Sequence, residues 1–234
     1  MSLPPLSVIM PVYNEEASAR KVVNEWFPVI AGCTPDFVFL GIDDGSKDGT
    51  LKVLQELQTE HGHRFEIVTR KNRGHGQSCL EGYRCAMDRG IPWVFQIDSD
   101  GQCDPQYFFR FWSMREDFDV IYGRRVRRDD GWRRVVASFV LRMTLLFSCA
   151  VNCVDANVPY RLIRTDILRG LVDRIPATFH LANIALSVLL RRQPKVREGV
   201  VKIRFLQRYG GEPSVTLGKF GSKAAELVQQ LKRL

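Results

Sequence analysis

Hydrophobic residues in the first half of the chain gather in short runs that end abruptly in polar turns. Runs of this kind, rich in Val, Ile, Leu and Phe and bounded by Asp, Asn, Gly or Pro, are typical of buried strands. The pattern predicts strands at Leu6–Met10, Phe37–Ile42, Phe65–Thr69, Trp93–Ile97 and Asp119–Gly123.

Longer amphipathic segments separate these runs, and their apolar residues recur at the spacing of a helix. We expect helices at Ala17–Ile30, at Leu51–Glu60, and from the segment Asn72–Ser78 through Met87. Because strand, turn and helix alternate, the expected fold class is α/β: a doubly wound, mostly parallel sheet with right-handed crossovers and helices on its faces.

The polar clusters of the chain follow the predicted strands directly, at Pro11–Glu15, Asp43–Asp44 and Asp98–Gln102. Parallel sheets bind ligands at the carboxyl ends of their strands, so we expect these clusters to share one crevice. Side chains two residues apart point to the same side of an extended chain, which brings Asp98, Asp100 and Gln102 together. Carboxylate and amide oxygens suit Mg²⁺ or Mn²⁺.

An Asp-x-Asp pattern alone is also typical of an acidic turn that caps the next helix. A calcium-binding loop beginning at Asp98 is excluded, because Cys103 and Phe109 occupy the places where such a loop needs Gly and Glu. The coincidence of the polar clusters with strand ends favours the metal site over the capping turn.

The sequence has no glycine-rich phosphate loop. Gly74-His75-Gly76 lacks the third glycine of a dinucleotide fingerprint, since Cys79 stands in its place, and no Walker A pattern occurs. A bound nucleotide would therefore be held by carboxylates, a metal ion and basic side chains. His75 fits a structural residue or a phosphate neighbour better than a catalytic base.

Composition narrows the choice of partners. The chain has 234 residues, enough for one α/β domain, and a net charge of +8, which favours anionic partners. Nucleic acid is not expected among them, because no recognition motif accompanies the charge. The six cysteines lack metal-type spacing and no signal-peptide pattern precedes the first strand, so we expect free thiols and a cytoplasmic location.

Arginines crowd the region after the last predicted strand, at Arg124, Arg125, Arg127, Arg128, Arg133 and Arg134. They form either a phosphate clamp beside a membrane surface or a solvated loop. The apolar run Val135–Val154 is long enough for a membrane span, but Arg142 near its middle favours an interfacial amphipathic helix or helix pair, or a core helix, over that span. We therefore expect a domain at residues 1–218, a basic amphipathic helix at 219–234, and attachment to the inner face of the membrane.

Taken in order, these motifs resemble those of the family 2 glycosyltransferases of GT-A fold. Within that family they are most similar to the polyprenyl-phosphate glycosyltransferases, the group of dolichyl-phosphate mannose synthase. The matching stretches are Val8–Glu15, Asp43–Thr50, Asp98–Gln102, Gly123–Arg125, Asp155–Arg161 and Arg208–Ser214. Of these, Asp155–Arg161 is a loose match to the Ser-Gly-Phe-Arg motif of the group.

The resemblance implies a nucleotide-diphosphate sugar, UDP- or GDP-linked, as donor and Mg²⁺ or Mn²⁺ as cofactor. The implied nucleotide-sugar ligands are Pro11, Tyr13, Glu15, Asp44 and Asp98. The implied metal ligands are Asp98, Asp100 and Gln102. The implied catalytic residues are Asp100, Asp155, Arg125 and Arg208, whose arginines would bind phosphate groups of donor or acceptor.

The acceptor can be argued from chemistry. Transfer to a sugar hydroxyl needs a general base, and relatives of that kind carry a Glu-Asp pair where this chain has Phe179–Asn183, without a carboxylate. A phosphate monoester, with a second pKa of about 6, is largely dianionic at neutral pH and needs no base. We therefore expect in-line attack by a polyprenyl phosphate, with inversion at the anomeric carbon. The alternatives are a saccharide hydroxyl acceptor, with His180 or Asp155 as base, and a non-catalytic nucleotide-sugar-binding module.

Overall fold

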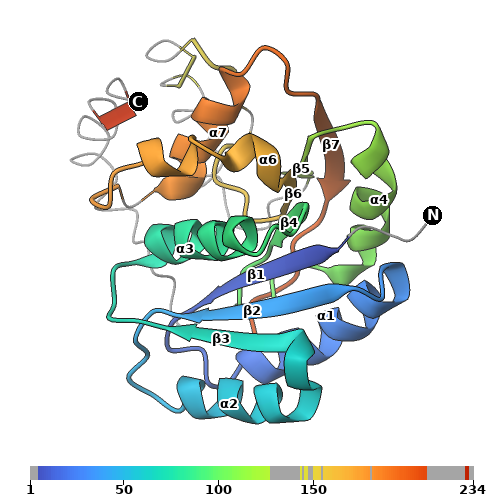
Figure 1. Ribbon diagram of the computed structural model, residues 1–234, viewed down its shortest axis with the longest axis vertical. Coiled ribbons are helices and arrows are strands. Elements are labelled where there is room, and N and C mark those ends of the chain that lie inside the picture. Colours follow the sequence, from blue (N-terminus) through green and yellow to red (C-terminus); the bar gives the residue numbers. More distant parts are fainter. Residues whose placement is uncertain are drawn as a thin grey trace.

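A computed structural model describes residues 5–126, 143, 145–146, 150–153, 155–179, 181–209 and 230–231. Within these ranges the centre of the molecule is a seven-stranded sheet in the order β3-β2-β1-β4-β6-β5-β7 (Figure 1). The strands are β1 Leu6–Val12, β2 Phe37–Asp43, β3 Phe65–Thr69, β4 Trp93–Gln96, β5 Val120–Arg125, β6 Arg161–Arg164 and β7 Glu198–Ile203.

The predicted doubly wound arrangement is confirmed for β1 to β4, which pair in parallel. From β1 the chain winds outward through β2 to β3 and then returns to place β4 on the other side of β1. β6 runs antiparallel to both of its neighbours, and β5 pairs in parallel with β7. The strand order therefore reverses between β1 and β4, where a sheet of this type forms its ligand crevice.

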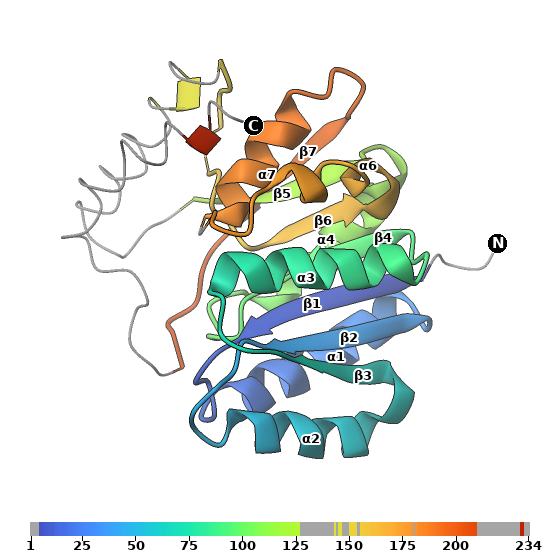
Figure 2. The same ribbon diagram turned by 60° about the vertical axis from the view of Figure 1, so that its left-hand side comes forward.

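Helices cover both faces of the sheet (Figure 2). One face carries α1 Ala19–Cys33, α2 Thr50–His61 and α4 Phe108–Ser113, and the other carries α3 His75–Asp88, α6 Thr165–Leu168 and α7 Ala182–Arg191. Single 3-10 turns lie at Gly62–Arg64, Pro105–Tyr107, Met114–Glu116 and Val172–Arg174. The alternation of β1 explains the two layers, because Val8 and Met10 enter the cluster of α1 while Ile9 enters that of α3.

An aromatic cluster supports β4, the strand that leads into the predicted metal site. The Phe95 ring centroid lies 5.4 Å from that of Trp26, 4.9 Å from Phe108 and 5.1 Å from Tyr160. All of these side chains are buried. Burying a ring of this size stabilises the fold by roughly 1.5–3 kcal/mol. This packing therefore fixes the position of β4 and of the loop that follows it.

β1 extends beyond its predicted end at Met10, through Pro11 to Val12. Ile9 O accepts a hydrogen bond from Ile97 N at 3.1 Å, so the backbone N–H and C=O of Ile9 face β4. Pro11 lies two residues later, so its backbone faces the same side. β4 pairs only with Leu6–Ile9. The absent N–H of Pro11 therefore removes no ladder bond, and β1 continues along β2.

The hydrophobic pattern does not predict β6, α7 or β7. β6 has four residues with an arginine at each end, and only its pairing with β4 and β5 makes it a strand. The predicted helices correspond to α1, α2 and α3, with ends shifted by a few residues. Every described cysteine is free, as expected.

The described ranges contain no helix that is both long and apolar enough to cross a membrane. Apart from isolated residues, the segments 135–154 and 219–234, for which we expect amphipathic helices, lie outside these ranges. So do Arg127, Arg128, Arg133, Arg134 and His180. The expectations for these residues stay predictions.

Candidate active site

The crevice at the reversal point gathers loops from distant parts of the chain. Glu15 N donates to Thr50 Oγ1 at 2.8 Å, which joins the loop after β1 to the start of α2. Leu206 N donates to Gln102 O at 2.9 Å and Tyr209 N donates to Asp100 O at 3.0 Å. The segment 204–209 after β7 is thereby fastened along the loop that carries the predicted metal ligands.

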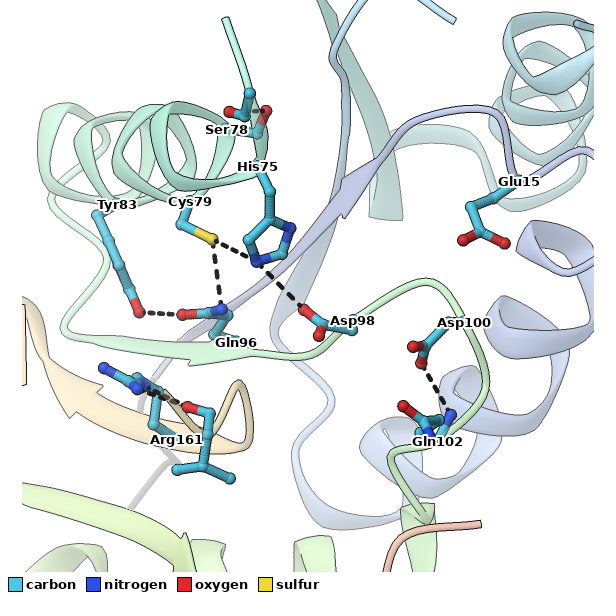
Figure 3. Close-up of polar contacts among 12 residues, drawn as sticks. Glu15, His75, Ser78, Cys79, Tyr83, Gln96, Asp98, Asp100, Gln102 and Arg161 are labelled. Carbon is cyan, nitrogen blue, oxygen red and sulfur yellow. Dashed lines mark hydrogen bonds and ion pairs between the residues drawn. The ribbon is translucent and has the colours of Figure 1, made fainter. Parts of the chain in front are cut away.

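Asp98 and Asp100 both lie on the loop at the exit of β4, where the Asp98 carboxylate is turned toward His75 and the Asp100 carboxylate toward Gln102 (Figure 3). Burial and the neighbouring Asp98 carboxylate raise the pKa of Asp100 to about 6. Gln102 N donates to Asp100 Oδ1 at 3.0 Å, so the loop folds back on itself. Side-chain exposure is 28% for Asp98 and 12% for Asp100, which leaves them reachable from the crevice but poorly hydrated.

This arrangement fits a divalent cation. Asp98 Oδ1 is a buried oxygen without a hydrogen-bond partner in the described part of the chain, and the like charges of Asp98 and Asp100 repel each other. A cation would satisfy both groups. The described residues contain no group of three or more His, Cys, Asp or Glu side chains placed to bind a metal, so oxygens from Gln102 or from a bound ligand would complete the coordination.

Arg208 lies between two of the predicted site carboxylates. Its Nη2 is 2.6 Å from Glu15 Oε1 and its Nη1 is 3.6 Å from Asp100 Oδ2. Ser18 Oγ donates to the other oxygen of Glu15 at 2.5 Å. The structure thus brings together Glu15 from the start of the chain, Asp100 from its middle and Arg208 from near its end.

Arg125 and Asp155 form a two-pronged ion pair beside this group. Arg125 Nε donates to Asp155 Oδ2 at 2.8 Å and Nη2 donates to Oδ1 at 2.5 Å. The guanidinium carbon of Arg125 is 5.1 Å from the centroid of the Phe205 ring, on the segment after β7. Both Asp155 oxygens contact Arg125, so Asp155 orients an arginine and is a poor candidate for a general base.

The predicted nucleotide ligands take different positions. Tyr13 is 41% exposed beyond the end of β1, whereas Pro11 is buried within that strand. Asp44 is buried, and its carboxylate accepts from Arg73 N at 3.0 Å and from Gly74 N at 2.7 Å. An ion pair with Arg70 at 3.0 Å completes its surroundings. The observed contacts of Asp44 therefore hold the loop that leads into α3, and its direct contact with a nucleoside stays a prediction.

A chain of polar side chains leads from the buried Tyr83, Gln96 and Cys79, through the half-exposed His75, to Asp98 (Figure 3). Tyr83 OH donates to Gln96 Oε1 at 2.5 Å, and Gln96 Nε2 lies 3.3 Å from Cys79 Sγ. His75 Nε2 lies 3.5 Å from Cys79 Sγ and 3.7 Å from Asp98 Oδ1. Sequence reasoning missed Gln96 and Tyr83. The available signal was a glutamine inside an otherwise apolar run, two residues before Asp98.

The mostly parallel seven-stranded sheet with helices on both faces is the architecture expected of a GT-A fold. Residues 7–171 match the family model described as glycosyl transferase family 2. The chain belongs to this family, which confirms the resemblance.

Curated relatives come from the expected group. An undecaprenyl-phosphate 4-deoxy-4-formamido-L-arabinose transferase of Proteus mirabilis is 27% identical over 170 residues, which cover 72% of this chain and 51% of that protein. A polyprenol monophosphomannose synthase of Mycolicibacterium smegmatis is 27% identical over 199 residues, covering 78% of this chain and 74% of that protein. The chain thus spans about half the length of the Proteus relative.

Solved structures share the fold at low sequence identity. A glucosyl-3-phosphoglycerate synthase from Mycobacterium tuberculosis, in complex with Mn²⁺, UDP-glucose and phosphoglyceric acid, superposes with a TM-score of 0.67 at 20% identity, covering 97% of this chain and 80% of that one. A mannosyl-3-phosphoglycerate synthase from Rubrobacter xylanophilus gives a TM-score of 0.66 at 14% identity, covering 98% and 73%. These likenesses confirm the fold class.

Proposed function

We propose that the protein transfers a glycosyl group, with inversion, from a UDP- or GDP-sugar to a polyprenyl phosphate, and that the transfer depends on Mg²⁺ or Mn²⁺. An oxygen of the lipid phosphate attacks the anomeric carbon while the bond from that carbon to the nucleoside diphosphate breaks. The products are a polyprenyl glycosyl phosphate and the nucleoside diphosphate. The observation that carries the proposal is the placement of two arginines, each aligned by a carboxylate, beside the Asp98–Asp100 loop.

The donor side is formed by the loops after β1 and β4. Asp98 and Asp100, with Gln102, would hold a divalent cation, whose charge would neutralise the departing diphosphate. Arg208, already between Glu15 and Asp100, is within reach of the same phosphate groups. Tyr13, exposed just beyond the end of β1, would meet the nucleoside.

The acceptor side is formed by Arg125. Asp155 holds the guanidinium through two hydrogen bonds, which fixes the plane in which Arg125 would meet a phosphate. A dianionic phosphate needs such an anchor and no general base. The engagement of Asp155 with Arg125 argues against the alternative in which Asp155 activates a sugar hydroxyl.

The names of the relatives support the substrate classes. Two curated relatives are named for undecaprenyl-phosphate and polyprenol-phosphate products or acceptors, and a solved structure of the same fold was obtained with Mn²⁺ and UDP-glucose. We place the enzyme at the inner face of a membrane, where a polyprenyl phosphate presents its head group to nucleotide sugars.

An acceptor panel tests the proposal. The purified protein is incubated with UDP- and GDP-sugars and with either undecaprenyl phosphate, dolichyl phosphate or an oligosaccharide, with Mn²⁺ or with EDTA. Product on a polyprenyl phosphate that disappears in EDTA is the expected result. Product on the oligosaccharide alone would support a hydroxyl acceptor, and nucleotide-sugar binding without turnover would support a non-catalytic module.

A further inference from the structure

Arg161 is a buried cation whose contacts the proposed mechanism does not use. It is fully buried at the first position of β6, opposite Gln96 of β4 and Tyr122 of β5. Because β6 runs antiparallel to its neighbours, this first position lies at the edge of the sheet where the candidate active site is formed (Figure 3). A buried arginine is costly, so its partners deserve a physical account.

The partners of Arg161 within the described residues are neutral. Nε and Nη2 donate to Val158 O at 3.0 and 2.5 Å, and Nη2 also donates to Ala156 O at 3.3 Å. Nη1 donates to Asn183 O at 3.3 Å and to Ser187 Oγ at 3.4 Å. The described structure shows carbonyl and hydroxyl acceptors around this guanidinium and no carboxylate, so charge pairing is not what these contacts achieve.

These contacts converge on one turn and one helix. Ala156 and Val158 belong to the turn that begins with Asp155, and Ser187 of α7 donates to the same Ala156 carbonyl at 2.9 Å. Arg161 thus joins the turn to Asn183 and Ser187, in the first two turns of α7. The residue at the start of this turn is Asp155, which aligns Arg125.

We propose that Arg161 is a positioning residue for the acceptor: by fixing residues 155–158 it sets the Asp155 carboxylate, which in turn aims Arg125 at the phosphate. This inference rests on the proposed function, since it assigns that phosphate to the lipid acceptor. The effect passes through Arg125, and Arg161 itself touches no substrate.

Arg161→Lys tests the inference, because lysine keeps the charge and loses the planar fork that spans the carbonyls. We expect the KM for geranyl phosphate to rise about 10-fold, since a small misplacement of a binding group can cost up to about 100-fold. The KM for the nucleotide sugar and the Kd for UDP with Mn²⁺ should change less than about twofold. Ser187→Ala, which removes a neutral partner of the same turn, should give a smaller shift in the same direction.

Leu162→Ala is the matched control. Leu162 is the next residue on β6, equally buried, and it packs on the opposite face of the sheet. It should lower the melting temperature while leaving the geranyl phosphate KM unchanged. A rise in this KM for Leu162→Ala equal to that for Arg161→Lys would reduce Arg161 to a general stabiliser and overturn the inference.

A double-mutant cycle tests whether the effect passes through Arg125. If it does, Arg125→Lys combined with Arg161→Lys should raise the geranyl phosphate KM no more than about twofold beyond Arg125→Lys alone. Full additivity overturns the inference, and so does weakened UDP binding with unchanged geranyl phosphate binding.

Calorimetry separates a failure of this inference from a failure of the proposed function. If the wild type transfers no sugar, only the proposed function fails, because the affinity for geranyl phosphate can still be measured and compared between the wild type and Arg161→Lys. Equal affinities in that comparison, or no binding by the wild type, overturn the inference.

Discussion

Asp98 and Asp100 face opposing physical demands. A cation site needs both side chains as anions, yet the crevice buries Asp100 and sets it beside a like charge, which raises its pKa to about 6. In the metal-free protein Arg208 offsets part of this repulsion, from 3.6 Å away. The proximity of the two carboxylates therefore lowers the folding stability, and a bound cation would restore it.

Asp100→Asn should stabilise the metal-free protein at high pH. The folded pKa of about 6 lies above the ordinary value of 3.8, so Asp100 contributes stability that is present below the ordinary pKa and lost as the pH rises through about 6. In EDTA the free energy of unfolding of the variant should exceed that of the wild type by about 1–3 kcal/mol near pH 8, and by about half as much near pH 5. Urea titrations at both pH values measure this, and a difference independent of pH would contradict it.

Asp98→Asn should remove most of the transfer activity, because an amide is a weaker ligand for a hard cation and carries no charge. We expect kcat to fall by about 100- to 1,000-fold, as when a main electrostatic group of an active site is lost. Asp104→Asn is the control: Asp104 lies on the same loop and accepts from Gln106 N at 3.0 Å, a bond that an amide oxygen can keep. Comparable losses in the two variants would show that the loop, and not the ligand, is responsible.

Pattern alone predicts much of this chemistry at the residue scale. The alternation of Asp98, Asp100 and Gln102 after an apolar run left a capping turn open, and the coincidence of polar clusters with several strand ends favoured a metal site. The contact between Glu15 and Arg208 spans 193 positions and depends on the course of the chain after β7, which no local pattern records. Gln96 and Arg161 were missed for a related reason: each is a polar residue in a short strand, and only the packed structure supplies its partners.

At the scale of elements, the segment 204–209 is locked against the carboxylate loop by one glycine. Gly101 has φ +79°, and a Cβ placed there would overlap the Tyr209 ring. That ring cannot easily yield, because Tyr209 OH donates to Glu25 at 2.7 Å and Lys21 Nζ lies 3.6 Å from the ring centroid. The close approach of Tyr209 therefore requires glycine at position 101.

Gly101→Ala should displace the segment that carries Arg208, whereas Gly90→Ala should not. Gly90 also has positive φ, +67°, but a Cβ there would meet nothing within 4 Å. Both variants bear the backbone cost of about 1 kcal/mol, and only Gly101→Ala adds the clash. We expect about 1–3 kcal/mol of additional destabilisation and a higher KM for the nucleotide sugar. Similar melting temperatures and similar KM values for the two variants would contradict the lock.

The elements themselves were predictable where local pattern and tertiary structure agree. Continuous apolar runs and helical periodicity located β1 to β4 and α1 to α3. β1, β2 and β4 are buried on both faces, β3 at the sheet edge is partly buried, and these helices each pack one stripe on the sheet. α7 differs: every residue of it from Ala182 to Leu190 is buried, so it shows no polar face to mark it as an amphipathic helix. β6 is too short to carry a periodic signal at all.

At the scale of the whole molecule, the net charge and the proposed lipid acceptor together predict how the protein attaches to a membrane. The +8 charge alone should draw the protein to anionic vesicles, because each basic residue near such a surface contributes about 1 kcal/mol at low salt. Co-sedimentation with phosphatidylglycerol vesicles should be strong at low ionic strength and weak in about 0.5 M NaCl, where the Debye length falls to a few ångströms.

Neutral phosphatidylcholine vesicles separate charge from insertion. If an amphipathic segment supplies most of the attachment, binding should persist on neutral vesicles and resist salt, because burial of apolar side chains is not screened. If charge supplies it, as we expect, neutral vesicles should bind little. Undecaprenyl phosphate doped into the neutral vesicles should then restore binding in proportion to its content, and Arg125→Lys should weaken that restored binding while leaving the attachment to phosphatidylglycerol intact. Loss of both attachments in Arg125→Lys would mean that Arg125 acts as one surface charge among many, without a specific phosphate contact.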